Sequence, residues 1–179
     1  LKRLLPAAGL GLCIGALSFQ VLSENSLRIM VGMIGLGFGI QWWAEHLGLR
    51  QPAEKPAPGP WHTRFWSAIA GFTSFSVHAG GPPLQVALLP QKLEPKTYAA
   101  TTVVFFTVVN LAKVFPYYWL DQFTYDVLWT ALILAPVGPF AVRLGIYLNK
   151  RISALWFYRV CYFGLVVSSG RLLIIGMTT

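Results

Sequence analysis

The stretch SFSVHAGGPPLQ, residues 74–85, places two glycines and two prolines inside a long apolar segment. Relative to alanine, a glycine costs a helix about 1 kcal/mol and a proline about 3 kcal/mol. Helix-like apolar sequence nevertheless continues on both sides, over Phe65–His78 and Pro83–Pro90. We therefore predict a helical segment that is broken at Gly80–Pro83, with one histidine, His78, beside the break.

The rest of the sequence has the composition of a membrane protein. Of its 179 residues, 55% are hydrophobic and 11% are charged, whereas ordinary soluble domains are roughly 25% charged. Long segments are nearly free of charge and close to the length that a helix needs to cross about 30 Å of hydrocarbon. These segments are Leu4–Leu22, Leu27–Leu47, Phe65–Pro90, Tyr98–Leu120, Val127–Leu148 and Ala154–Met177. We predict an all-α polytopic protein of the lipid bilayer.

Composition also excludes several classes of function. We attribute the net charge of +8 to cytoplasmic loops and anionic lipid rather than to nucleic acid. Cys13 and Cys161 stand in separate apolar runs without metal-ligand spacing. The sequence contains no HExxH, GxSxG or Walker motif. We therefore expect neither an enzyme nor a cofactor or metal.

Basic residues indicate how the broken segment lies in the membrane. If 65–90 crossed completely, the lysines and arginines of the loops would be divided evenly between the two sides. If it enters and leaves through one face, a single side holds all of them except Arg28. These residues are Lys2, Arg3, Arg50, Lys55, Arg64, Lys92, Lys96, Lys150 and Arg151. Because basic residues concentrate in cytoplasmic loops, we predict a re-entrant helical hairpin over 65–90 that opens toward the cytoplasm.

Two parts of the chain resemble each other. LLPAAGLGLCIGALSF, from Leu4, and LAPVGPFAVRLGIYLN, from Leu134, share the spacing P-x8-G. In the hairpin topology they run in opposite directions, as inverted structural repeats of secondary transporters do; a chance match between apolar helices is the alternative. We divide the chain into 1–47, the last two transmembrane helices of a first repeat, 48–64, a Pro-rich cytoplasmic linker, and 65–179, the second repeat. On this division the second repeat consists of the hairpin 65–90 and three transmembrane helices, and a further Gly-rich hairpin and one span are expected ahead of 1–47.

A family resemblance follows from the same motifs. GFTSFSVHAGGPPLQVALLP, followed by TTVVFFTVVNLAKVFPYY, resembles the second half of the TauE/SafE family of sulfite and organosulfonate exporters. The GGPP element and the N-x-x-K of Asn110 to Lys113 carry the resemblance, which extends through essentially the whole chain. It implies a multi-pass anion transporter of the bacterial inner membrane, with a substrate such as sulfite, a sulfonate or thiosulfate. The residue His78 is not general to the family, so the resemblance implies no role for it.

The broken segment itself predicts an anion site. The N-terminus of a helix carries about half a positive charge and offers free amides, and glycine lets a ligand approach the backbone closely. The alternative is a break that serves packing alone. The candidate substrate-binding residues are Ser76, His78, Gly80, Gly81, Pro82, Asn110 and Lys113.

Several of these residues have a second interpretation. The hydroxyls of Thr73, Ser74 and Ser76 are expected to bond to the preceding helical turn more often than to a ligand. A neutral His78 bonded to a carbonyl is the alternative to a proton carrier. Lys113 either attracts anions or extends toward the interface.

The functional hypothesis is a secondary transporter that exports a small sulfur-containing anion. A proton gradient is the simplest energy source, with His78 as the coupling residue. A passive channel for the same anions is the alternative. The sequence leaves open the exact substrate and whether the protein is a homodimer.

Overall fold

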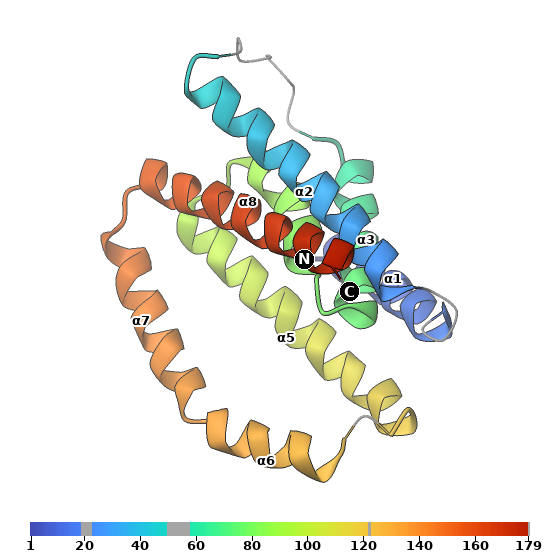
Figure 1. Cartoon of the computed structure of the whole chain (residues 1–179). Helices are drawn as coiled ribbons and strands as arrows, with labels where there is room; N and C mark the ends of the chain where they lie inside the picture. Colours follow the sequence, from blue (N-terminus) through green and yellow to red (C-terminus); the bar gives the residue numbers. More distant parts are fainter. Residues whose placement is uncertain (19–22, 50–57, 122, 179) are drawn as a thin grey trace.

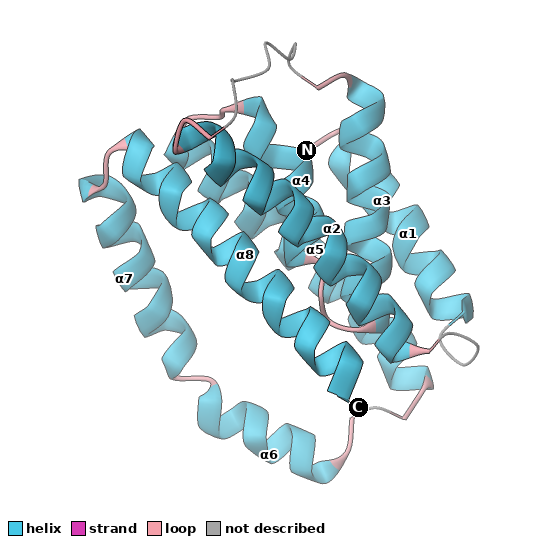
Figure 2. Ribbon diagram, turned by 45° about the horizontal axis from the view of Figure 1, so that its top comes forward, coloured by secondary structure: helices cyan, strands magenta, loops and turns pink. Residues whose placement is uncertain are grey.

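The computed structural model describes residues 1–18, 23–49, 58–121 and 123–178, and these residues form helices and connecting loops without strands (Figure 2). Eight α-helices and one short 3-10 helix follow in chain order: α1 (Leu4–Ser18), α2 (Glu24–His46), α3 (Pro60–Ser76), α4 (Gly81–Leu88), η1 (Leu89–Gln91), α5 (Pro95–Trp119), α6 (Tyr125–Leu134), α7 (Val137–Arg151) and α8 (Ala154–Thr178). The end of the first predicted span and residues 50–57 of the predicted linker, including Arg50 and Lys55, lie outside the described residues.

Local sequence signals explain where several helices begin. Pro60 and Pro95 stand in the first turns of α3 and α5, where proline's missing N–H is not needed. The side chain of Thr124 accepts a hydrogen bond from the amide of Val127 and caps α6. α3 therefore starts five residues before the predicted start at Phe65, because proline favours the first turn of a helix.

The helices α1, α3 and α5 begin at the same end of the bundle. A cavity of about 440 Å³ at this end is lined by Leu4, Thr63 and Thr97, one from near the start of each helix. α8 begins there too, since the Tyr158 hydroxyl donates to the carbonyl of Leu93 at 2.5 Å. We call this end of the bundle the basic end. It carries Lys2, Arg3, Arg64, Lys92 and Lys96.

Glycines let α1 and α3 approach to backbone contact. A Cβ atom on Gly11 would clash with the carbonyl oxygen of Ala68, and one on Gly71 would clash with the carbonyl oxygen of Ala8. The two helices thus present the same A-x-x-G pattern to each other. Small residues at such positions are the means by which helices pack closely in a membrane.

α2 and α8 form a second close pair, and they run antiparallel. A Cβ on Gly32 would lie 2.8 Å from the carbonyl oxygen of Ser169, whereas a Cβ on Gly176 would lie 2.8 Å from the side chain of Ile29. Figure 1 shows the two helices lying along each other on one side of the bundle.

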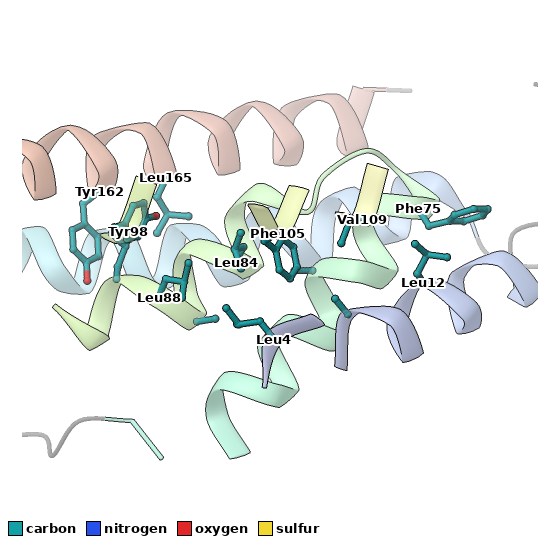
Figure 3. Close-up of a cluster of buried hydrophobic side chains, with 14 residues drawn as sticks. Leu4, Leu12, Phe75, Leu84, Leu88, Tyr98, Phe105, Val109, Tyr162 and Leu165 are labelled. Carbon is teal, nitrogen blue, oxygen red and sulfur yellow. The ribbon is translucent and has the colours of Figure 1, made fainter. Parts of the chain in front are cut away.

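The short helix α4 lies at the centre of the packed helices. Figure 3 shows Leu84 and Leu88 of α4 among Phe105 of α5, Leu165 of α8 and Leu4 of α1. Each of these side chains is at most 3% exposed. The half-helix that follows the break is therefore fixed by apolar contacts from three neighbouring helices.

The predicted span over Val127–Leu148 is not one continuous helix, because the structure divides it into α6 and α7. Pro136 stands at the junction, where its missing N–H removes a hydrogen bond and its ring clashes with the carbonyl of the preceding turn, although Ala135 before it keeps helical angles. The two helices meet at 43°. No described side chain of α6 or α7 is buried, and Figure 1 shows the pair extending away from the other helices.

By length and apolar composition, three helices among the described residues could span a membrane: α2, α5 and α8. The bent pair of α6 and α7 makes a fourth if it is counted as one span. The described part of α1 has 15 residues, or about 22 Å at 1.5 Å per residue, and the rest of the predicted Leu4–Leu22 lies outside the described residues. The chain is thus a multi-pass helical membrane protein.

The α1–α3 contact predicts different effects of alanine at two glycines of the same helix. Gly11→Ala should lower the apparent Tm of the purified protein in detergent by several degrees, because overpacking costs about 1–3 kcal/mol. The matched control is Gly9→Ala, because nothing lies within 4 Å of a Cβ at Gly9. That variant should leave the Tm unchanged or raise it. Equal Tm values for the two variants would contradict the predicted backbone contact.

Candidate functional site

The break consists of Val77–Gly80, between the end of α3 at Ser76 and the start of α4 at Gly81. Thr73 connects its two sides: its carbonyl accepts from the amides of Val77 and Ala79 at 3.1 and 3.0 Å. Its hydroxyl bonds to the carbonyl of Ile69 at 2.8 Å and approaches that of Ala79 at 3.1 Å. The back-bonding expected of Thr73 is therefore confirmed, and this side chain organises the turn.

His78 stands at the sharpest point of the turn. Its φ of 53° lies in the left-handed region, which is uncommon for residues other than glycine. The side chain is exposed, and its Nε2 lies 3.5 Å from the hydroxyl of Tyr117. A residue in this conformation persists only where the surrounding structure holds it.

The two glycines after His78 have different surroundings. A Cβ on Gly80 would lie 2.7 Å from both the carbonyl oxygen of Ala70 and the Cβ of Ser74, so Gly80 allows α4 to approach α3. At Gly81, by contrast, nothing lies within 4 Å of the corresponding position. Gly80 is thus a packing residue, whereas Gly81 borders open space.

The prolines limit which amides the start of α4 can offer. α4 begins at Gly81, two residues before the predicted start at Pro83. Pro82 and Pro83 have no N–H, and the amide of Leu84 already bonds to the carbonyl of Gly80 at 3.2 Å. The donors that remain at this helix end are the amides of Gly80 and Gly81. The anion-binding capacity predicted for a helix N-terminus is therefore concentrated in two residues.

Lys113 of α5 bonds to the last turn of α3. Its ammonium nitrogen lies 3.1 Å from both the carbonyl oxygen and the hydroxyl of Ser74, and the residue is 6% exposed. Tyr117, one turn later, donates its hydroxyl to the carbonyl of Phe75 at 2.8 Å. α5 thus supplies donors to carbonyls that a helix C-terminus leaves without partners. The two predicted roles of Lys113, attracting anions or extending to the interface, stay predictions; in the structure its ammonium group is buried against Ser74.

The other predicted site residues lie around this cluster in different directions. Ser76 faces α1, because a Cβ atom added to Gly15 would lie 3.4 Å from the Ser76 hydroxyl oxygen. That hydroxyl is buried and has no hydrogen-bond partner among the described residues. Pro82 is buried in α4. Asn110 is exposed, one turn before Lys113 on α5. The structure thus brings His78, Gly80 and Lys113 together around the end of α3 and separates Ser76 from them.

The sequence prediction missed two candidates. Tyr117 follows Lys113 by four residues, so both lie on one face of α5, and this spacing could have identified Tyr117 from the sequence. Gln85 follows Gly81 by four residues in α4, and its Oε1 is buried without a partner in the described part of the chain. Unpaired buried polar atoms of this kind need an explanation.

The described residues contain no cluster of three or more His, Cys, Asp or Glu side chains that could hold a metal ion. The fold and the break define a polytopic helical membrane protein with an interrupted helical segment at its centre. The model of the family described as Sulfite exporter TauE/SafE matches residues 1–172. The chain therefore belongs to this family of membrane transporters, which confirms the resemblance seen in its motifs. A comparison with curated proteins and one with solved structures give no match.

The bond between Tyr117 and the end of α3 predicts a local effect. Tyr117→Phe should increase amide hydrogen exchange over residues 75–80 and lower the Tm slightly, because such interhelical bonds contribute about 0.6 kcal/mol on average. The matched control is Tyr118→Phe, since Tyr118 is 71% exposed and lies one residue away on the same helix. Unchanged exchange over 75–80 in Tyr117→Phe would show that this bond does not hold the break.

Proposed function

We propose that this protein is a secondary transporter of the bacterial inner membrane that exports sulfite or a related small sulfur-containing anion. Membership of the TauE/SafE family supports the general class. The specific proposal is that the anion binds at the break between α3 and α4. The observation that carries this proposal is the open space beside Gly81, at the start of α4, where the amides of Gly80 and Gly81 are the remaining donors.

The charges around the break favour an anion. The end of α3 carries a partial negative charge and the start of α4 a partial positive one, so the two would largely cancel. The ammonium group of Lys113 lies on the end of α3 and bonds to Ser74. Its charge offsets the negative helix end, which leaves the positive start of α4 to act on a ligand. We propose that Lys113 supports the substrate site in this way from behind α3.

Other side chains can complete the coordination of an oxyanion. Asn110 and Gln85 carry amide N–H donors, and His78 is exposed beside Tyr117. We propose that the amide of Gly81, Asn110, Gln85 and His78 contact the anion, while Gly80, Pro82 and Ser76 shape the break. A sulfur oxyanion presents several acceptor oxygens, which suits a site made of separate neutral donors.

We also propose that residues 65–90 form a re-entrant hairpin. Its support is that the two ends of the segment meet at the basic end, where the Gln91 side chain lies 3.3 Å from the Thr63 hydroxyl. On this proposal 48–64 is a cytoplasmic linker, and basic residues of the hairpin's ends face the cytoplasm.

The inverted-repeat division into 1–47 and 65–179 remains part of the proposal. α1 and α7 are both 15 residues long, and α2 and α8 are 23 and 25 residues long. The small residues Ala8, Gly11 and Gly15 of α1 correspond in spacing to Gly138, Ala141 and Gly145 of α7. We propose that two such units move against each other to expose the site alternately, within a monomer or a homodimer.

A substitution at Gly81 tests the site. Gly81→Val should leave the Tm near that of the unmodified protein, because its side chain enters open space. Uptake of radiolabelled sulfite into liposomes that contain the full-length protein should fall about tenfold or more. The valine side chain would fill the space from which the anion reaches the backbone amide, and a hydrogen bond to a charged group contributes about 1.5–3 kcal/mol.

Gly37→Val is the matched control for that measurement, because nothing lies within 4 Å of a Cβ at Gly37 either. It should transport normally. Unchanged sulfite uptake in Gly81→Val, with measurable uptake by the unmodified protein, would remove the break as the anion site. Absence of uptake by the unmodified protein for sulfite, sulfonates and thiosulfate would instead contradict the substrate class.

His78 is the proposed proton-coupling residue. His78→Asn removes the titratable ring, while asparagine tolerates the left-handed conformation better than most residues. The increase in sulfite uptake caused by an imposed pH gradient should disappear, whereas exchange of sulfite between equal concentrations should persist. His62→Asn is the control at the basic end. A gradient response that survives in His78→Asn would show that another group couples transport to protons.

A further inference from the structure

A second concave feature lies away from the break, where α2 ends and α8 begins. Its volume is about 480 Å³, within the range of about 300–1,000 Å³ found for ligand clefts. Trp43 and His46 of α2 form one wall, and Trp156, Arg159 and Phe163 of α8 form the other. We call this feature the Arg159 groove. It shares no residue with the proposed anion site.

The Arg159 groove contains a cation without an acidic partner. The guanidinium carbon of Arg159 lies 5.3 Å from the centre of the Trp156 ring, and its Nε is buried without a hydrogen-bond partner among the described residues. The one ion pair in the described part of the chain joins Arg28 to Glu24, elsewhere on α2. No carboxylate lines the groove. The nearby Glu45 accepts a hydrogen bond from Gln41 within its own helix.

The position of the histidine is fixed by stacking. The ring of His46 stacks on that of Trp42 at 4.2 Å, and Trp42 in turn stacks on Tyr162 of α8 at 4.2 Å. His46 is therefore held at the mouth of the groove near Arg159. These two side chains offer N–H donors to a single negatively charged group.

The remaining surface of the groove is apolar and suits a hydrocarbon chain. Trp43, Val160 and Phe163 provide it, and Trp156 is 58% exposed beside them. Tryptophans concentrate at the level of the lipid headgroups. The groove also lies at the basic end of the bundle, at the ends of two helices long enough to span a membrane. A free inorganic anion would gain nothing from this apolar wall.

We propose that the Arg159 groove binds one anionic glycerophospholipid from the leaflet at the basic end. The phosphate group contacts Arg159 and His46, and the first part of an acyl chain lies along Val160 and Phe163. Basic pockets between transmembrane helices on the cytoplasmic side bind anionic headgroups for the same reason. The inference depends on the groove's charge and shape and does not require the proposed transport function.

The test compares two lipids with identical acyl chains, phosphatidylglycerol and phosphatidylcholine. Native mass spectrometry of the full-length protein should show tighter retention of phosphatidylglycerol. In Arg159→Gln this retention should weaken about fivefold, because a basic residue near an anionic membrane surface contributes about 1 kcal/mol. Arg143→Gln is the matched control, since Arg143 is an exposed arginine of α7 outside the groove. It should retain the lipid as the unmodified protein does.

A second measurement covers the case in which Arg159→Gln does not fold. For the unmodified protein in detergent, added phosphatidylglycerol should raise the Tm more than phosphatidylcholine, and the difference should shrink as salt is increased. Arg159→Lys keeps the charge and should preserve part of the difference. Equal effects of both lipids on the unmodified protein would overturn the proposal. Equal loss of retention in Arg143→Gln and Arg159→Gln would also overturn it, because the effect would then be one of total charge.

Discussion

In the hydrocarbon of a membrane a helix cannot end without partners for its last carbonyl groups, and α3 finds them on α5. Lys113 and Tyr117 donate to the carbonyls of Ser74 and Phe75, so the interruption at Val77–Gly80 is held from outside the segment. The same interaction places a positive charge at the negative end of α3. The contact that holds the end of α3 therefore also sets the charge beside the break.

The arrangement depends equally on close backbone packing. Gly11 and Gly71 bring α1 onto α3, and Gly80 brings the start of α4 onto the same helix. α3 is thus packed against α1, α4 and α5, whereas nothing lies within 4 Å of a Cβ at Gly81. Because small residues rather than apolar volume produce these contacts, a single added methyl group is a strong perturbation.

The sequence predicts the helical class, the family and the position of the break, because each depends on local composition or on a short motif. It does not predict the buried state of Lys113, since the acceptors of that lysine belong to another helix 39 residues earlier in the chain. Pro136 in the sequence indicates the junction of α6 and α7, but the length of the apolar segment favoured a single helix. The direction of the Ser76 side chain was likewise not predictable from the sequence, because its hydroxyl faces Gly15 of another helix.

The proposed topology requires that the broken segment enters and leaves through one face of the membrane. In a background without Cys13 and Cys161, single cysteines can be placed by Arg64→Cys, Lys92→Cys and Asp126→Cys, all at exposed positions, and labelled in intact cells with an impermeant maleimide. The hairpin predicts that the Asp126→Cys variant reacts from outside, whereas the Arg64→Cys and Lys92→Cys variants react only after the membrane is permeabilised. Labelling of the Lys92→Cys variant from outside, with the Arg64→Cys variant protected, would mean that the segment crosses the membrane and would rule out the re-entrant hairpin.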